Sequence, residues 1–257
     1  MKRIGKAFAY VILLMILLSA YLIFSFGKDL IFAAKPGQNK GTYFNGKEYI
    51  QINHTVTGNF TAVLWAKYST ANSLGVMLAS GIGENEHSAW YIGDGGEITN
   101  KTACGIFSDQ RIGNYTAGWR FAVIPQLPPG NWYQIACVYN KTAVSLYVDG
   151  RLVNYTPTPY AITNASIIQI GKRTSTFYIN GKIPSFVYFT GYLENIQIYD
   201  KALNASSVLA LYNSGIGGKP ISNVTIYVPL ANAALSIGKS IPYYINNTMS
   251  YAAVLST

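Results

Sequence analysis

The stretch from Asn131 to Gly150 (NWYQIACVYNKTAVSLYVDG) places the strongest constraint on what this chain can fold into. Two apolar runs, Trp132–Tyr139 and Val144–Val148, are joined by a short polar turn and end at Asp149-Gly150. The second run alternates apolar and polar residues, which is typical of a half-buried strand. The first run is apolar at both parities, as in a strand packed on both faces. We therefore expect a central antiparallel hairpin with shorter strands around it.

Short apolar or alternating runs fill most of the remaining chain, and Gly, Asn, Pro or Ser separates them. The expected strands are 42–44, 49–52, 59–68, 76–80, 89–92, 103–107, 120–124, 152–155, 167–170, 186–188 and 192–199. Many short strands at roughly even spacing predict a sandwich, a barrel or a jelly roll. One helix is expected at Ala205–Tyr212, with Asn204 or Asp200 as its N-cap and Gly215 just past its end.

Composition suits a β protein outside the cytoplasm. Apolar residues make up 50% of the 257, while charged residues make up only 11%, about half of the globular norm. Six of the 19 basic residues precede residue 41, where only Asp29 opposes them, so 13 basic residues face 9 acidic ones in the remainder. The net charge of +9 is therefore unevenly placed, and a nucleic-acid-binding function has poor support.

The N-terminus predicts a membrane anchor. Ala7–Phe26 is an uncharged apolar segment of 20 residues, which matches a hydrocarbon core of about 30 Å. Lys2, Arg3 and Lys6 should stay in the cytoplasm and place the rest of the chain outside. A cleaved signal peptide with its site at Leu18-Ser19-Ala20 is an alternative, as is prepilin-type processing after Gly5.

Sequons agree with an exterior location. The pattern Asn-x-Ser/Thr occurs ten times, whereas chance pairing would give about three. Asn204 is the least favoured of them, because an asparagine that caps a helix is less available for a glycan. We expect glycosylation at Asn53, Asn59, Asn100, Asn114, Asn140, Asn154, Asn164, Asn223 and Asn246.

Four segments follow from these patterns. Residues 1–27 form the basic tip and the transmembrane anchor, 28–41 a linker, and 42–218 the main domain. The pattern restarts after residue 218, and the remaining residues are too few to bury a core of their own. Residues 219–257 are therefore expected to pack on the preceding domain or to begin a second, truncated module.

Several motifs follow one another along the chain. They are Tyr43-Phe44-Asn45-Gly46, Asn59-Phe60-Thr61 with Trp65, Gly130-Asn131-Trp132, Ser145 to Gly150, Ile170-Gly171, Phe189 to Gly191, and Leu193 to Leu203 with Leu211-Tyr212. Together these motifs resemble the laminin-G-like branch of the concanavalin A-like jelly-roll (lectin/glucanase) superfamily. The resemblance covers residues 42–213. It implies an all-β fold, a two-sheet antiparallel jelly-roll sandwich, preceded here by one N-terminal transmembrane helix.

The superfamily includes glucanases, so a catalytic site must be tested. Retaining hydrolysis needs two carboxylates about 5 Å apart. Only Glu84 and Glu86 have a suitable spacing, in a stretch (GIGENEHS) that is typical of an exposed loop. The two histidines, His54 and His87, lie near no Gly-x-Ser-x-Gly turn, and with two cysteines they make a poor zinc set. We expect no enzymatic activity.

The resemblance favours a calcium ion at the rim of the sandwich, because the family often binds one there through Asp and backbone oxygens. Asp94 and Asp109 end adjacent predicted strands and are the candidate ligands, although each also fits a plain turn. Trp90 and Trp119 flank predicted loops, so their rings are the candidate ligand contacts, while Trp65 and Trp132 are expected in the core.

Cys104 and Cys137 fall in strands that this topology could bring together. A disulfide is plausible outside the cell, and two free thiols in an apolar core are the alternative.

These expectations define a membrane-anchored, extracellular module that binds carbohydrate or protein at the cell surface without catalysing a reaction. A structural or pilin-like filament subunit is the alternative, and a glycoside hydrolase has the least support. N-terminal sequencing would separate an intact anchor from a filament subunit that begins at Lys6.

Overall fold

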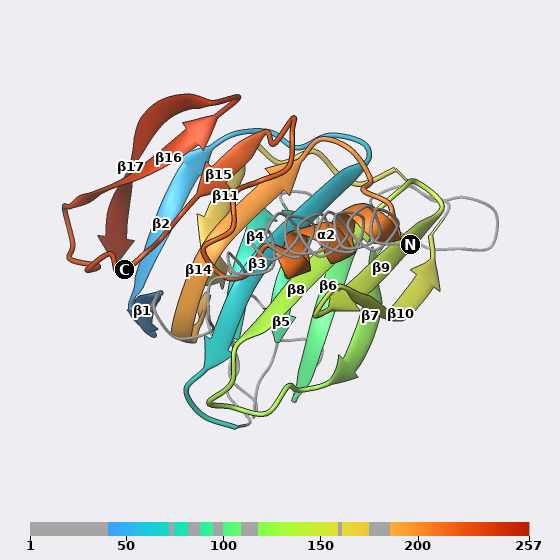
Figure 1. Cartoon of the computed structure of the whole chain (residues 1–257), viewed down its shortest axis with the longest axis horizontal. Helices are drawn as coiled ribbons and strands as arrows, with labels where there is room; N and C mark the ends of the chain where they lie inside the picture. The colour runs from blue at the N-terminus through green and yellow to red at the C-terminus, as the bar shows by residue number, and fades with distance from the viewer. Residues whose placement is uncertain are drawn as a thin grey trace, which may run out of the picture.

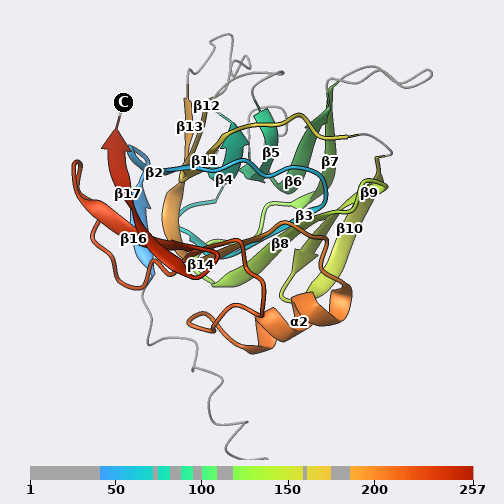
Figure 2. The same ribbon diagram turned by 90° about the horizontal axis from the view of Figure 1, so that it is seen from above.

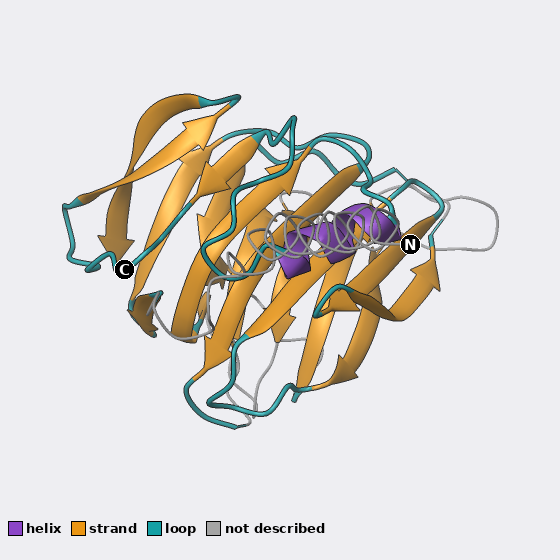
Figure 3. Cartoon of the chain, in the orientation of Figure 1, coloured by secondary structure: helices purple, strands orange, loops and turns teal. Residues whose placement is uncertain are grey.

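A computed structural model describes residues 41–71, 75–81, 88–94, 100–108, 118–158, 161–174 and 186–256. Two sheets face each other and one helix lies outside them (Figures 1 and 2). Strands dominate the described chain (Figure 3), so the predicted all-β, two-sheet sandwich is confirmed. The expected anchor, Ala7–Phe26, lies outside the described residues. Within them, the one helix falls well short of the length needed to cross a bilayer.

The first sheet, sheet A, contains the expected hairpin toward one side. Its strands, in spatial order, are β10 (Arg151–Pro157), β9 (Ala143–Val148), β8 (Tyr133–Tyr139), β3 (Phe60–Tyr68), β14 (Thr190–Tyr199), β15 (Ile226–Val228), β16 (Ser240–Ile245) and β17 (Thr248–Ser256), with β1 (Thr42–Asn45) beside the first half of β14. The β8–β9 hairpin is not central, contrary to expectation. The centre is formed by β3 and β14, the longest apolar strands, because each pairs along both edges.

The second sheet, sheet B, faces the first across the core. Its strands, in spatial order, are β7 (Gly118–Pro125), β6 (Lys101–Ser108), β5 (Ser88–Asp94), β4 (Gly75–Gly81), β11 (Ile167–Ile170) and β2 (Glu48–Asn53). The strand β12 (Lys172–Thr174) follows β11 after Gly171 and pairs with β13 (Phe186–Tyr188). Alternation places one face of each strand in the core between the sheets.

The core is built from the expected strands and from the C-terminal segment. Phe60, Leu64 and Ile198 of sheet A meet Ile50 and Trp90 of sheet B, all of them fully buried. Aliphatic residues after residue 218 belong to the same cluster. These are Ile226, Val228, Leu230, Ile241 and Val254.

The helix α2 (Ala205–Asn213) covers the outer face of sheet A, as Figure 2 shows. Asn204 is its N-cap, because Asn204 Oδ1 accepts a hydrogen bond of 2.9 Å from the backbone nitrogen of Ser207. Val208 and Leu211 are the buried helical residues, and Tyr212 stacks on Trp65 of β3. The helix thereby shields the middle of this outer face from solvent.

The C-terminal hairpin closes one edge of the sandwich. The first part of β17 pairs with β16 in sheet A, whereas Val254–Ser256 pair with β2 in sheet B. The hairpin turns at Asn246-Asn247, which both have positive φ, as a two-residue turn between twisted strands requires. Residues 219–256 thus pack on the two sheets of the preceding domain, and their reading as a decayed second module stays a prediction.

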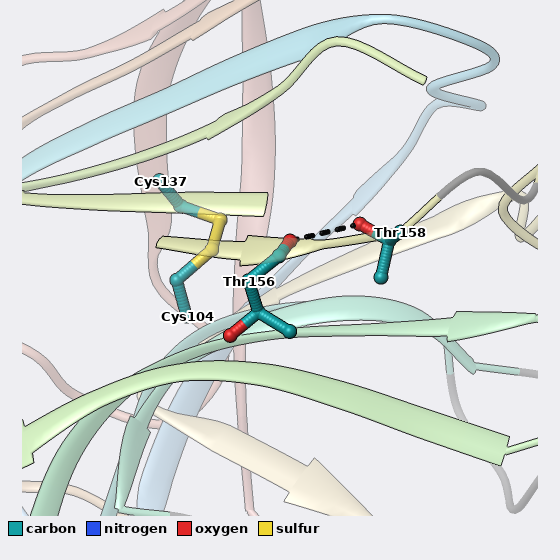
Figure 4. Close-up of a disulfide and its surroundings, with 4 residues drawn as sticks. All are labelled: Cys104, Cys137, Thr156 and Thr158. Atoms are coloured by element: carbon teal, nitrogen blue, oxygen red, sulfur yellow. Dashed lines mark hydrogen bonds between the residues drawn. A yellow bond between two sulfur atoms is a disulfide. The ribbon is translucent and has the colours of Figure 1, made fainter. Parts of the chain in front are cut away.

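A disulfide joins the two sheets through the core. Cys104 lies on β6 of sheet B and Cys137 on β8 of sheet A, with their Cα atoms 5.4 Å apart (Figure 4). Both residues are fully buried. Of the two alternatives that the sequence leaves open, the structure contains the bridge.

Candidate binding pocket

The predicted ligand contact at Trp90 is wrong. Trp90 is fully buried between the sheets, and its ring stacks on Phe60 with a centroid distance of 4.8 Å. The strand β5 turns this residue inward, because the cross-strand partners of Trp90, Ser80 and Ile106, also face the core. Proximity to a predicted loop did not reveal which way the side chain points.

Trp119 lies on the outer face of sheet B, away from Trp90. Its ring stacks on Phe121 with an interplanar angle of 10°, and the Arg173 guanidinium carbon lies 4.4 Å from its centroid. Arg173 is itself 1% exposed. The two predicted tryptophan contacts therefore occupy opposite faces of sheet B and do not form one site.

The predicted calcium ligands fall only partly within the described chain. Asp94 is the last residue of β5, paired with Gly75, and Asp109 lies outside the described residues, as do Glu84 and Glu86. Within the described ranges, no three His, Cys, Asp or Glu side chains form a group that could hold a metal ion. Calcium binding stays a prediction.

Most sequons lie at the surface. The exposed asparagines are Asn53, Asn59, Asn100, Asn140, Asn164, Asn204, Asn223 and Asn246, and Asn114 lies outside the described residues. Asn154 differs, because it is half-buried and its Nδ2 donates a hydrogen bond to the backbone oxygen of Val123. A glycan at Asn154 would disturb this hydrogen bond, and glycosylation there stays a prediction.

An open pocket of about 630 Å³ lies where the segment after α2 meets β15 and β16. Tyr227 and Tyr244 are cross-strand neighbours on its wall, with ring centroids 6.0 Å apart and an interplanar angle of 24°. Both rings are half-buried. The other lining residues are Gly217, Lys219, Pro220, Ile221, Ser222, Asn223, Val224, Pro229 and Asn247. We call this site the tyrosine pocket.

A smaller pocket of about 350 Å³ adjoins it. The two share Asn223, Val224 and Asn247, and the smaller one continues to Asp200 and Lys201. The lining residues of the two pockets together form a groove with aromatic rings at one part and amides and charges at the other. Such a mixture of rings and convergent polar groups is typical of small-molecule sites.

A chain of hydrogen bonds connects β14 to the segment that lines the tyrosine pocket. Tyr199 donates to Gln197 Oε1 at 2.6 Å, and Gln197 Nε2 donates to Asn195 Oδ1 at 2.8 Å. Asn195 Nδ2 in turn donates to the backbone oxygen of Gly218 at 2.8 Å. Gln197 is the register partner of Tyr227, so this network ties the segment after α2 to the strand beneath the pocket.

Electrostatics keep the pocket tyrosine neutral. Burial raises the pKa of Tyr227, and the nearby Glu194 and Tyr244 raise it further. Its hydroxyl therefore stays protonated at neutral and mildly alkaline pH and can donate a hydrogen bond. Among the described lining residues of this pocket, Lys219 carries the one formal charge.

Sequence reasoning missed this pocket. Tyr227 and Tyr244 were hidden among 21 tyrosines, and their strands belong to a segment that reads as weakly patterned. A usable signal was the alternation in NVTIYVP, which turns Tyr227 away from Ile226 and Val228. The second half of the pocket wall is formed by β16, which the sequence did not predict.

Comparison with family models decides the classification. The model described as the concanavalin A-like lectin/glucanases superfamily matches residues 44–209, more than half of the chain. The chain belongs to this superfamily. Comparison with curated protein sequences finds no match.

Two solved structures share the superfamily sandwich. A heptameric SAP-like pentraxin from Limulus polyphemus aligns with a TM-score of 0.51 at 13% identity, over 84% of this chain and 93% of that chain. A candidate carbohydrate-binding protein from Bacteroides ovatus aligns with a TM-score of 0.52 at 11% identity, over 82% of this chain and 58% of that chain. At these identities the likeness shows the fold.

The tyrosine pocket lies outside the region that the superfamily model matches. All its lining residues fall between Gly217 and Asn247, whereas the match ends at residue 209. The pocket is thus formed on the outer face of sheet A by residues of the C-terminal segment.

Proposed function

We propose that this chain is a membrane-anchored, extracellular binding module that holds carbohydrate in the tyrosine pocket, without catalysing a reaction. The observation that carries the proposal is the pair of half-buried tyrosine rings in a pocket edged by amides and one lysine. Sugars present apolar C–H faces that pack on aromatic rings, and hydroxyls that pair with amides and phenols. The Bacteroides ovatus neighbour, a candidate carbohydrate-binding protein, supports this choice among ligand classes.

A glycan screen tests the proposal. The full chain is produced in a host that does not N-glycosylate, so that Asn223 and Asn246 at the pocket rim carry no glycan, and it is screened on oligosaccharides with and without calcium. We expect binding that falls about tenfold or more in Tyr227→Ala or Tyr244→Ala, the loss of about 1.4 kcal/mol of contact. Tyr251→Ala is the matched control, because Tyr251 is 62% exposed on β17 and does not line the pocket.

Two results would contradict the proposal. The first is silence on every glycan in both buffers, which favours a protein ligand or the filament alternative. The second is glycan binding that both pocket variants retain, which places the site elsewhere. Turnover of a β-glucan that disappears in Glu84→Gln or Glu86→Gln would instead establish a hydrolase.

A further inference from the structure

A row of four side chains crosses the outer face of sheet A at the end where the described chain begins. Tyr43 of β1 is the register partner of Tyr192 of β14, which is the partner of Lys67 of β3. Trp132, just before β8, completes the row beside Lys67. We call these four residues the aromatic–lysine row.

The row is continuous in space. The ring centroids of Tyr43 and Tyr192 are 5.0 Å apart, and those of Tyr192 and Trp132 are 6.3 Å apart. Lys67 Nζ lies 4.6 Å from the Tyr192 centroid and 5.7 Å from that of Trp132, within cation–π range.

The row is open to solvent, whereas the neighbouring row on this sheet face is covered by α2. Tyr43 is 45% exposed, and the other three are half-buried. The neighbouring row consists of the register partners Trp65 and Glu194, which are both buried. Tyr212 of α2 covers Trp65. The expectation that Trp132 is a core residue is therefore wrong, because its side chain lies on the outer face.

The chain enters the domain beside this row. A side chain at Gly41 would come within 2.6 Å of Trp132 Cη2, so the backbone at Gly41 lies directly against the Trp132 ring. The preceding linker of 14 residues has a root-mean-square span of about 20 Å if flexible. The row can consequently reach a bilayer that holds the predicted segment Ala7–Phe26. This conclusion rests on the membrane anchor of the proposed function.

We propose that the aromatic–lysine row is a membrane-contact surface that seats the domain on the headgroup layer of the bilayer holding its own anchor. Trp and Tyr rings favour the membrane–water interface, since one end is apolar and the other polar. Lys67 can lay its aliphatic stem along these rings and direct its ammonium group to an anionic headgroup.

The chain is suited to a direct test, because none of its four tryptophans precedes residue 41. The full chain is reconstituted into vesicles of equal parts phosphatidylcholine and phosphatidylglycerol that carry lipids spin-labelled near the headgroup. We expect part of the tryptophan emission to be quenched by the labelled lipid, and this quenched part to disappear in Trp132→Phe. Trp119→Phe is the control that keeps it, because Trp119 lies on sheet B.

Tyr43→Ser provides a second variant that leaves the core intact, since Tyr43 is the most exposed member of the row. We expect it to reduce the quenching at least twofold, and Lys67→Glu to reduce it in the anionic vesicles but not in phosphatidylcholine alone. Vesicle flotation of the same samples measures separately whether the anchor holds the chain on the bilayer.

Each outcome bears on the proposal. A chain that floats with vesicles and shows no quenching overturns the membrane contact and leaves the anchor intact. A chain that does not float overturns both. Row variants that keep the quenching but lose binding to a glycan would make the row a carbohydrate surface instead, which also overturns the proposal.

Discussion

Asn154 on β10 donates a hydrogen bond of 2.5 Å from its Nδ2 to the backbone oxygen of Val123 on β7. Thr156 makes the same kind of contact, from its Oγ1 to the backbone oxygen of Phe121 at 2.6 Å. These two side chains connect the edge strands of the two sheets. The sandwich is therefore held by side chains at this edge and by the strand β17 at the other.

We expect Asn154 to carry no glycan, as is also expected of Asn204, the N-cap of α2. A glycan on its Nδ2 would have to lie between the edges of the two sheets and would weaken the contact with Val123. Glycopeptide mass spectrometry of protein from a glycosylating host measures this, with exposed Asn140 and Asn164 as internal references. If glycans occupy Asn154 as often as Asn140, the contact between β10 and β7 does not exclude a glycan and the expectation is wrong.

Removing the disulfide should destabilise the domain by about 4 kcal/mol. Cys104 and Cys137 are separated by 33 residues, and closing a loop of that length restricts the unfolded chain by roughly this amount. The double variant Cys104→Ala/Cys137→Ala keeps the core apolar, so the loss reports the cross-link. Urea unfolding with and without reductant is the measurement, and an unchanged midpoint for wild type in reductant would refute the expectation.

Truncation after Gly218 should prevent cooperative folding. The removed segment contributes Ile226, Val228, Leu230, Ile241 and Val254 to the main core. Burying one such side chain is worth about 1.5–3 kcal/mol, so the five together contribute as much as the usual stability of a whole domain. Near-ultraviolet circular dichroism and thermal unfolding measure the outcome. A truncated chain that unfolds like the full domain would instead identify residues 219–257 as a separable module.

Stability should fall above pH 10 because of buried tyrosines. Burial raises the pKa of Tyr139 to about 12, and it also raises that of Tyr199. The unfolded chain then loses these protons near pH 10 while the folded chain keeps them, so the stabilisation is complete below pH 10 and is lost between pH 10 and 12. Each such residue accounts for up to about 2 kcal/mol.

The variant Tyr139→Phe isolates this effect. Its unfolding free energy, measured by urea at pH 9 and pH 11, should change less with pH than that of wild type. Tyr155→Phe is the matched control, because Tyr155 is 60% exposed and should leave the pH dependence as it is. Parallel pH profiles for wild type and Tyr139→Phe would exclude Tyr139 as a cause.

Periodicity located most strands because it reports local geometry. Apolar residues at every second position mark a strand wherever its face meets a core, and runs such as Phe60–Tyr68 are too apolar to lie elsewhere. The sequence pattern did not predict strands β16 and β17. Pro242 interrupts the pattern of β16, and exposed polar residues weaken the apolar pattern of β17. The pair Asn246-Asn247 was the available signal, since asparagine tolerates the positive φ of a tight hairpin turn.

The sequence by itself determined the all-β class, the superfamily motifs and the position of the described helix, because each depends on residues close together in the chain. Only the tertiary structure decided that Asn204 caps this helix, that the two cysteines meet, and where a pocket opens. It also decided that the Trp90 ring faces the core and the Trp132 ring the outer face of sheet A, because the packing of the two sheets sets which face is buried. The tyrosine pocket depends on β14, the segment after α2, and β16, which meet only after the C-terminal segment has packed on sheet A.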